Sequence, residues 1–323
     1  MNTKFEIGRF AWRLGIWSPK LGLWDLEFGL WDFRFGIWLL GFGISLVVTA
    51  CASAAPTPTP PPQLPTISGP TEIQVAVAAS DFLPGAPRVP FVLFDGTHPI
   101  ADAKAVKVYA FDLATPSAPQ AGWGGAAASY SDYEIPYWVV HPELPRAGVW
   151  GLGVEIAKAD GRTVQSQFTI QVVETIASPA VGGRPPASRN RTLATEPDIH
   201  KLTSGLGPVP ALYQITVADA LKSGKPTVVV FASPGFCASR LCAPVVNSVE
   251  AVHKAQPEAA NYIHLEVYKS FNPLVGSDEM EEWHLVSEPW IFILDKTGKV
   301  AARLGGPVSP RELTEALTPL ITP

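Results

Sequence analysis

The sequence predicts a multidomain protein in which an all-β sandwich, residues 68–175, precedes an α/β domain, residues 201–323. In the first region, apolar and polar residues alternate in short segments, which is the pattern of half-buried strands. The second region contains a continuous apolar run at 226–231, as expected of a strand buried on both faces, and then apolar residues at helical spacing. Residues 176–200, rich in Pro, Gly, Ser and Arg, are expected to link the two domains.

The composition excludes some classes of function. The chain has 323 residues and a formal net charge of −5, with no basic stripe, so no nucleic acid partner is expected. Its 3 cysteines are too few for a secreted disulfide scaffold. They fit one lipid anchor and one redox or structural pair. The sequence leaves the oligomeric state open.

The N-terminal region predicts export and anchoring. Residues 35–50 are apolar and uncharged, a run shorter than the ~20 residues of a membrane-spanning helix. The run ends in Val-Thr-Ala before Cys51, which resembles the bacterial lipobox. The resemblance implies that residues 1–50 are a lipoprotein-type signal peptide with an unusual repeat leader, and that Cys51 is lipidated. The protein would then be held at the cell membrane on its extracytoplasmic side, with residues 51–67 as a Pro-rich tether. The alternative is a plain signal peptide or membrane anchor with an incidental cysteine.

Strand and turn signals define the first domain. Gly follows Asp at 95–96 and at 160–161, where turns are expected. The pattern resembles the immunoglobulin-like accessory domains of exported bacterial proteins. His98 and His141 are interpreted as isolated surface histidines, with metal ligation as the alternative. Strands are expected at 73–77, 106–111, 150–156 and 168–173.

The second domain has a different order of elements. The expected order is β-α-β-α-β-β-α once a preceding strand or helix is allowed for, with a turn at 296–298 between the last two strands. Strands are expected at 226–231, 262–268, 290–295 and 299–303, and helices at 217–222, from Cys242 onward and at 310–320.

This layout resembles the thioredoxin fold, and in particular its exported, membrane-tethered branch, over roughly residues 208–320. The resemblance rests on VVVFASPGFCASRLC, on Glu288-Pro289 before a strand, and on the DKTG hairpin that follows. It implies thiol–disulfide exchange through Cys237 and Cys242 with protein thiols or disulfides. It also implies that Pro289, with a cis bond before it, lies against the cysteines, offers backbone to a peptide and keeps metal ions from the dithiol.

The chemistry explains the position of the pair. The thiolate is the nucleophile in disulfide exchange, and the free N–H groups at a helix N-terminus stabilise it. Cys237 is therefore the candidate attacking residue, and Cys242 would resolve the mixed disulfide.

Three features depart from the family pattern. The spacing is Cys-x4-Cys instead of Cys-x2-Cys, Phe236 replaces the usual tryptophan, and Glu288 replaces a threonine or small apolar residue. On a regular helix, residues five apart have Cα atoms about 8.6 Å apart, whereas a disulfide needs less than about 7 Å. The segment must therefore bend, or the helix must begin after Cys237, near Ser239.

Three charged residues near the pair carry open interpretations. Glu288 is a candidate catalytic residue, because a carboxylate there would disfavour the thiolate or accept a proton. Glu266 is a second candidate, with an ordinary charge at a strand end as the alternative. Arg240 either favours the thiolate or is a solvated arginine.

The leading interpretation is a membrane-anchored, extracytoplasmic thioredoxin-like protein that exchanges disulfides. The second is copper handling of the copper-chaperone type, with the cysteine pair and His284 as ligands, because soft thiolates suit Cu(I). The third is a non-catalytic binding module in which Cys237–Cys242 is a structural disulfide. No cofactor is expected, and no metal-ligand spacing is recognised, so the sequence leaves open whether the protein is an enzyme.

Overall fold

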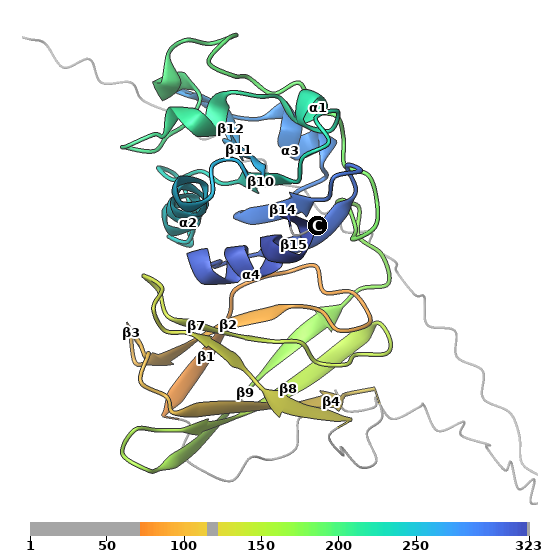
Figure 1. Ribbon diagram of the computed structural model, residues 1–323. Helices are drawn as coiled ribbons and strands as arrows, with labels where there is room; N and C mark the ends of the chain where they lie inside the picture. Colours follow the sequence, from red (N-terminus) through yellow and green to blue (C-terminus); the bar gives the residue numbers. More distant parts are fainter. Residues whose placement is uncertain (1–71, 115–121, 322–323) are drawn as a thin grey trace, which may run out of the picture. The chain divides into compact units, whose positions relative to one another are not determined.

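The computed structural model describes residues 72–114 and 122–321 (Figure 1). All of these residues belong to one compact unit, Thr59–Pro323. The predicted signal peptide, the predicted lipidation site Cys51 and the whole Pro-rich tether lie outside the described residues. Within the described ranges, no helix is both long and apolar enough to cross a membrane.

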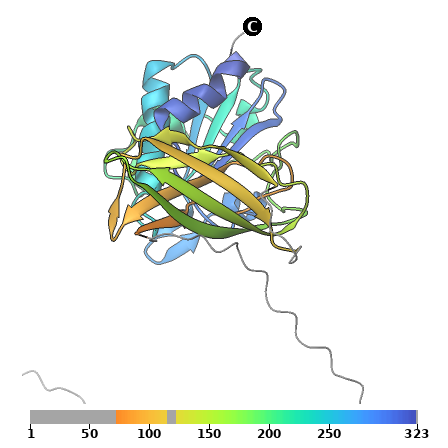
Figure 2. The same cartoon turned by 90° about the horizontal axis from the view of Figure 1, so that it is seen from below.

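The N-terminal half is made of two antiparallel sheets. The first has the strand order β1-β2-β7-β6 with β3 paired to β2, and the second has the order β5-β4-β8-β9. One apolar cluster contains side chains from both sheets, among them Phe91 and Trp138 of the first and Val108 and Leu152 of the second. Figure 2 shows these strands, coloured orange to green. The strands are β1 Ile73–Val77, β2 Val89–Asp95, β3 His98–Pro99, β4 Ala105–Asp112, β5 Trp123–Ala126, β6 Ala128–Tyr130, β7 Tyr137–Val140, β8 Gly148–Ala157 and β9 Thr163–Val172.

The four strands predicted from alternation are confirmed as β1, β4, β8 and β9. Strands β2 and β7 lack the alternation, because most of the first and all of the second is buried on both faces. One face of their sheet packs into the sandwich core. The other carries a second cluster that includes Tyr130, Tyr133 and Tyr137.

The connecting segment 176–200 has no helix or strand before the 3-10 turn η1, Ile199–Lys201, yet it is fastened to the C-terminal half. The backbone N–H of Val217 donates to the Asn190 side chain over 2.8 Å. The indole N–H of Trp283 donates to Ser188 Oγ over 2.9 Å. Both Ser188 and Asn190 are buried. The segment therefore covers part of the C-terminal fold.

The C-terminal half is built on a four-stranded sheet of order β11-β10-β14-β15. Strand β10 runs parallel to β11 and antiparallel to β14. One apolar cluster covers each face of this sheet, and α2 and α4 contribute to one of them. The elements are η2 Pro210–Tyr213, α1 Val217–Ala220, β10 Thr227–Phe231, α2 Cys242–Ala255, β11 Asn261–Leu265, β12 Tyr268–Phe271, β13 Leu274–Gly276, α3 Asp278–Glu282, β14 Trp290–Leu294, β15 Val300–Gly305 and α4 Pro310–Ile321.

From β10 onward, and apart from the small strands β12 and β13, the order is β-α-β-α-β-β-α, and its second helix, α3, is one that the sequence did not predict. The order agrees with the thioredoxin-like layout. One insertion was not predicted. Strands β12 and β13 form a separate two-stranded sheet between β11 and α3.

A buried ion pair joins the sandwich to α4. Arg88, just before β2, donates to both carboxylate oxygens of Glu312, over 2.6 and 2.8 Å. The same guanidinium donates to the carbonyls of Gly305 and Pro307. Tyr137 of β7 donates to Glu312 over 2.5 Å. Both charged side chains are less than a tenth exposed, so each depends on the other for its buried charge.

We expect Arg88→Ala to lower the free energy of unfolding by about 3–5 kcal/mol, because it leaves the Glu312 charge buried without its partner. Urea unfolding would measure the loss. The control is Arg146→Ala, which breaks a more exposed pair with Asp112 and should lower the free energy of unfolding much less. Equal losses in the two variants would contradict the importance of burial.

Candidate redox site

The two cysteines form a disulfide at the start of α2, with Cα atoms 6.0 Å apart. The sequence placed Cys237 at the helix N-terminus, and this is wrong, because α2 begins at Cys242. Residues 234–241 instead form turns. Arg240, at φ +60°, lies in the left-handed region and helps to reverse the chain. The expectation that the helix begins after Cys237 is met. The Cα–Cα distance of 6.0 Å between Cys237 and Cys242 is shorter than the about 8.6 Å of a regular helix.

The two sulfur atoms differ in access. Cys237 is partly exposed, and its Sγ lies 3.2 Å from the hydroxyl of Ser239. Cys242 is fully buried in the cluster beneath α2. A reagent from solvent therefore reaches Cys237 first.

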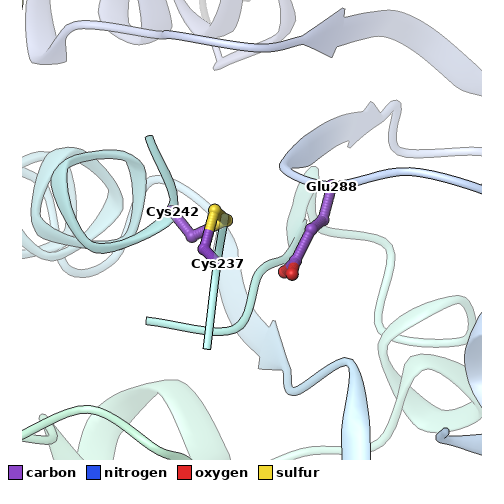
Figure 3. Close-up of side chains that lie close together, drawn as sticks. All are labelled: Cys237, Cys242 and Glu288. Carbon is purple, nitrogen blue, oxygen red and sulfur yellow. A yellow bond between two sulfur atoms is a disulfide. The ribbon is translucent and has the colours of Figure 1, made fainter. Parts of the chain in front are cut away.

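The segment before β14 brings Pro289 and Glu288 to the pair. The Glu288–Pro289 peptide bond is cis, as the thioredoxin resemblance implies. A carboxylate oxygen of Glu288 and the Sγ atoms of Cys237 and Cys242 all lie within 4.8 Å of one another (Figure 3). Oxygen Oε2 of Glu288 is buried and has no hydrogen-bond partner. Burial raises the pKa of the Glu288 carboxyl to about 7, although the backbone N–H of Ser233 opposes the shift.

Glu266 has a different environment from Glu288. It follows β11, is buried, and accepts hydrogen bonds from the N–H and hydroxyl of Ser204, each over 2.7 Å. The backbone N–H of Val267 donates to its other oxygen over 3.1 Å. The hydroxyl of Ser204 also accepts the N–H of Gly235, over 2.9 Å. Glu266 therefore ties the loop around Ser204 to the loop that carries Cys237.

Below this network lies a buried histidine. The Nε2 atom of His264 lies 2.9 Å from the carbonyl of Ala232 and its Nδ1 lies 2.6 Å from the hydroxyl of Tyr213. Burial lowers the pKa of His264 below its ordinary value. The neutral ring must donate from Nε2, because Ala232 can only accept. Tyr213 then donates to Nδ1. His264 therefore supports the end of β10 without reaching the disulfide.

The remaining sequence candidates are not brought to this group. Arg240 is exposed in the turn before α2. His284 is exposed and lines a different surface hollow with Met280 and Leu285. His98 and His141 are also exposed. Among the described residues, the one cluster of three potential metal ligands is Cys237, Cys242 and Glu288.

Sequence reasoning missed an apolar surface next to the pair. The exposed ring of Phe236 lies 5.8 Å from that of Tyr268 and 5.6 Å from that of Phe271, both on the β12–β13 hairpin. Leu274 and Val275 of the same hairpin are exposed. Leu206 is fully exposed in the loop that Ser204 ties to Gly235. The run Phe-Asn-Pro-Leu-Val at 271–275 was the available signal, because it combines a turn with apolar flanks.

No protein-family model matches the chain, and no curated protein matches it. Several solved structures share part of its fold. The thioredoxin-family thiol:disulfide interchange protein from Chlorobium tepidum TLS is 14% identical, with 33% of this chain and 86% of that chain covered and a TM-score of 0.26. StoA from Bacillus subtilis is 18% identical, with 29% and 82% covered and a TM-score of 0.24. CopC from Methylosinus trichosporium OB3b is 14% identical, with 32% and 92% covered and a TM-score of 0.23. Each likeness is limited to about a third of this chain, so the chemistry of the site rests on its own residues.

The raised pKa of Glu288 predicts a pH-dependent stability. The native carboxyl keeps its proton up to about pH 7, whereas the unfolded chain loses it near the ordinary pKa of about 4.3. The contribution of the Glu288 carboxyl to the free energy of unfolding is complete below the ordinary pKa of about 4.3 and is lost as the pH rises through about 7. Relative to Glu288→Gln, the wild-type free energy of unfolding should therefore fall over this window. Urea unfolding at several pH values would measure the difference, and parallel curves for the two proteins would contradict the assignment.

Proposed function

We propose that this protein is an extracytoplasmic thiol–disulfide oxidoreductase that acts through Cys237 and Cys242. The observation that carries the proposal is the asymmetry of the pair. The partly exposed sulfur of Cys237 is bonded to the fully buried sulfur of Cys242 at the start of α2. This arrangement lets a substrate meet one sulfur while the other is kept for the second step.

The exchange proceeds in two balanced steps. A substrate thiolate attacks Sγ of Cys237, the bond to Cys242 breaks, and Cys242 leaves as a thiolate. A second substrate thiolate then attacks the mixed disulfide and releases Cys237 as a thiolate. The substrate dithiol loses two electrons and becomes a disulfide, while the protein disulfide gains them and takes up two protons. The reverse sequence oxidises the protein and reduces a substrate disulfide.

Glu288 is placed to move a proton in these steps. Its carboxyl oxygen lies within 4.8 Å of both sulfur atoms, close enough to act directly or through one water molecule. With a pKa of about 7, the group is present in both protonation states near neutral pH. The acid protonates the departing Cys242 thiolate, and the carboxylate accepts the proton from the Cys242 thiol in the reverse direction.

The surface around Cys237 favours polypeptide substrates. Of the 7 large apolar side chains exposed among the described residues, Leu206, Phe236, Leu274 and Val275 belong to the loop around Ser204, the cysteine loop or the β12–β13 hairpin. An exposed apolar surface of this kind marks a site of interaction. Pro289 completes the site, as the thioredoxin resemblance implies, by offering its neighbour's backbone to an extended chain. We therefore propose proteins with apolar segments beside a cysteine as the substrates.

Anchoring follows from the N-terminal sequence. We propose that Cys51 is lipidated after removal of residues 1–50 and holds the protein on the outer side of the cell membrane. The Pro-rich segment 51–67 then extends the folded part away from the lipid. The β-sandwich is proposed to be an immunoglobulin-like accessory domain between the anchor and the redox site.

Two alternatives make different demands on the site. Copper binding of the copper-chaperone type needs a third ligand such as His284, which lies outside the group of Cys237, Cys242 and Glu288. A purely structural disulfide in a binding module needs no access to solvent, whereas Cys237 is partly exposed. Both observations favour exchange over these alternatives.

We expect the disulfide to equilibrate with glutathione at a midpoint potential above about −300 mV, the range of labile disulfides. Alkylation and mass spectrometry of protein held in buffers of known potential would measure the oxidised fraction. A Cys51→Ser background leaves the pair as the only thiols, because the chain has 3 cysteines. Cys237→Ser should abolish exchange with a protein substrate, and Cys242→Ser should accumulate the mixed disulfide.

A midpoint below that range would identify a stable structural disulfide. Unchanged exchange in the Cys237→Ser variant would equally contradict the proposal.

The apolar surface predicts a selective loss of activity. Leu206→Ser or Leu274→Ser should lower kcat/KM about tenfold for a reduced, unfolded protein, because each removes one buried aliphatic contact in the complex. The rate with dithiothreitol, a dithiol that is too small to span the surface, should not change. Val149→Ser replaces an exposed apolar residue of the sandwich and is the matched control. Equal losses with both substrates would show that the serine variants disturb the disulfide itself.

A further inference from the structure

The three groups around the disulfide also have the composition of a metal site. Two cysteine sulfur atoms and one carboxylate oxygen lie within 4.8 Å of one another. They come from three separate segments, namely the loop after β10, the first residue of α2 and the residue two positions before β14 (Figure 3). Ligands from separate segments of a packed fold are held in place by that fold.

The donor set fits zinc better than copper. Zinc takes thiolate and carboxylate ligands together in tetrahedral geometry, with Zn–S near ~2.3 Å and Zn–O near ~2.0–2.2 Å. Donor atoms around such an ion are roughly 3.3–3.8 Å apart by these bond lengths. The carboxylate oxygen lies within 4.8 Å of each sulfur, so small side-chain movements can bring the donor atoms to that spacing. Cu(I), which is softer, prefers thiolate and thioether ligands and would gain little from the carboxylate.

The unpartnered oxygen of Glu288 supplies an independent reason. Oxygen Oε2 is buried without a hydrogen-bond partner, and a buried acceptor without a partner costs free energy. A cation bound between this carboxylate and the sulfur atoms would satisfy it. The nearby Glu266 accepts hydrogen bonds from Ser204 and Val267, so it has no such need.

The thioredoxin resemblance implies the opposite, since it assigns to Pro289 the role of keeping metal ions from the dithiol. Here the residue directly before that proline brings a carboxylate to the sulfur atoms. This chain thus has a possible ligand where the family has a threonine or a small apolar residue. The Glu288–Pro289 segment therefore presents a possible ligand, whereas in the family the matching segment keeps metal ions from the dithiol.

We propose that reduced Cys237 and Cys242, together with Glu288, bind one Zn²⁺ ion. A dithiol reductant first converts the disulfide to two thiols and is itself oxidised to a disulfide. Zn²⁺ then displaces the two thiol protons and binds both thiolates and the carboxylate. Three protein ligands leave one position for water or an incoming ligand, as in exchangeable zinc sites. Bound zinc and the disulfide exclude each other, so zinc should also block exchange at Cys237. The inference rests on the proposed function only in requiring that the disulfide can be reduced.

The test uses the protein in the Cys51→Ser background, reduced with a phosphine and freed of metal. Zn²⁺ is titrated in competition with a chromophoric chelator. Co²⁺ reports the ligands, since thiolate ligation gives a charge-transfer band and a tetrahedral site gives strong visible bands.

We expect one ion per chain, protection of Cys237 from alkylation, and affinity weakened at least about tenfold in Glu288→Gln. Glu288→Asp should retain more affinity than Glu288→Gln. Glu250→Gln, which changes a half-buried carboxyl of α2 outside the group, should bind as the wild type does.

Absence of zinc binding by the fully reduced protein would overturn the proposal. So would equal affinity in the wild type and Glu288→Gln, or stoichiometric binding of Cu(I) with none of Zn²⁺. Disulfide exchange measured in the presence of a metal chelator separates the two proposals. Exchange that proceeds there while zinc fails to bind would remove the zinc site alone.

Discussion

The burial of strand β10 on both faces positions the rest of the site. Its five residues are all buried, with Val228 and Val230 in one apolar cluster and Val229 and Phe231 in the other. Because neither face can turn to solvent, the strand has one register between β11 and β14. The chain leaves β10 toward Cys237, leaves β11 at Glu266 and enters β14 from Glu288. The end of one apolar strand thus brings the sulfur atoms and both carboxylates together.

The two carboxylates at this edge differ because of their partners. Glu266 accepts three hydrogen bonds from protein groups and serves to join two loops. Glu288 keeps one oxygen without a partner and carries a raised pKa. A buried acid without full hydrogen bonding is free to take a proton or a cation, whereas the hydrogen bonds of a fully bonded one fix its position. The difference between the two glutamates therefore follows from their local hydrogen bonds, since the residue type is the same.

The sequence predicted strands from two patterns, namely alternation, as in β4, and a continuous apolar run, as in β10 and β14. Strands β2 and β7 lack alternation and were not recognised, because their second face is covered by other residues of the chain. Helix geometry correctly excluded a regular helix between Cys237 and Cys242. The helical spacing from Cys242 onward agrees with the observed start of α2, whereas the left-handed turn at Arg240 was not predicted. Their positions in the sequence made Glu288 and Glu266 candidates, but the sequence could not show which of the two lacks hydrogen-bond partners.

The same physical reason links exchange and metal binding at this site. Both need one sulfur that solvent can reach, a second that the fold holds in place, and an acid whose proton is easily given up near neutral pH. A cysteine pair in a sealed core would have no sulfur that a substrate or an ion from solvent could reach. A fully exposed pair would have no buried carboxylate like that of Glu288 beside it. Since two electrons separate the disulfide from the dithiol, the redox state of the surroundings selects between them. In the two proposals the carboxylate would serve each state in turn, as an acid toward a leaving thiolate and as a ligand once both thiolates are free.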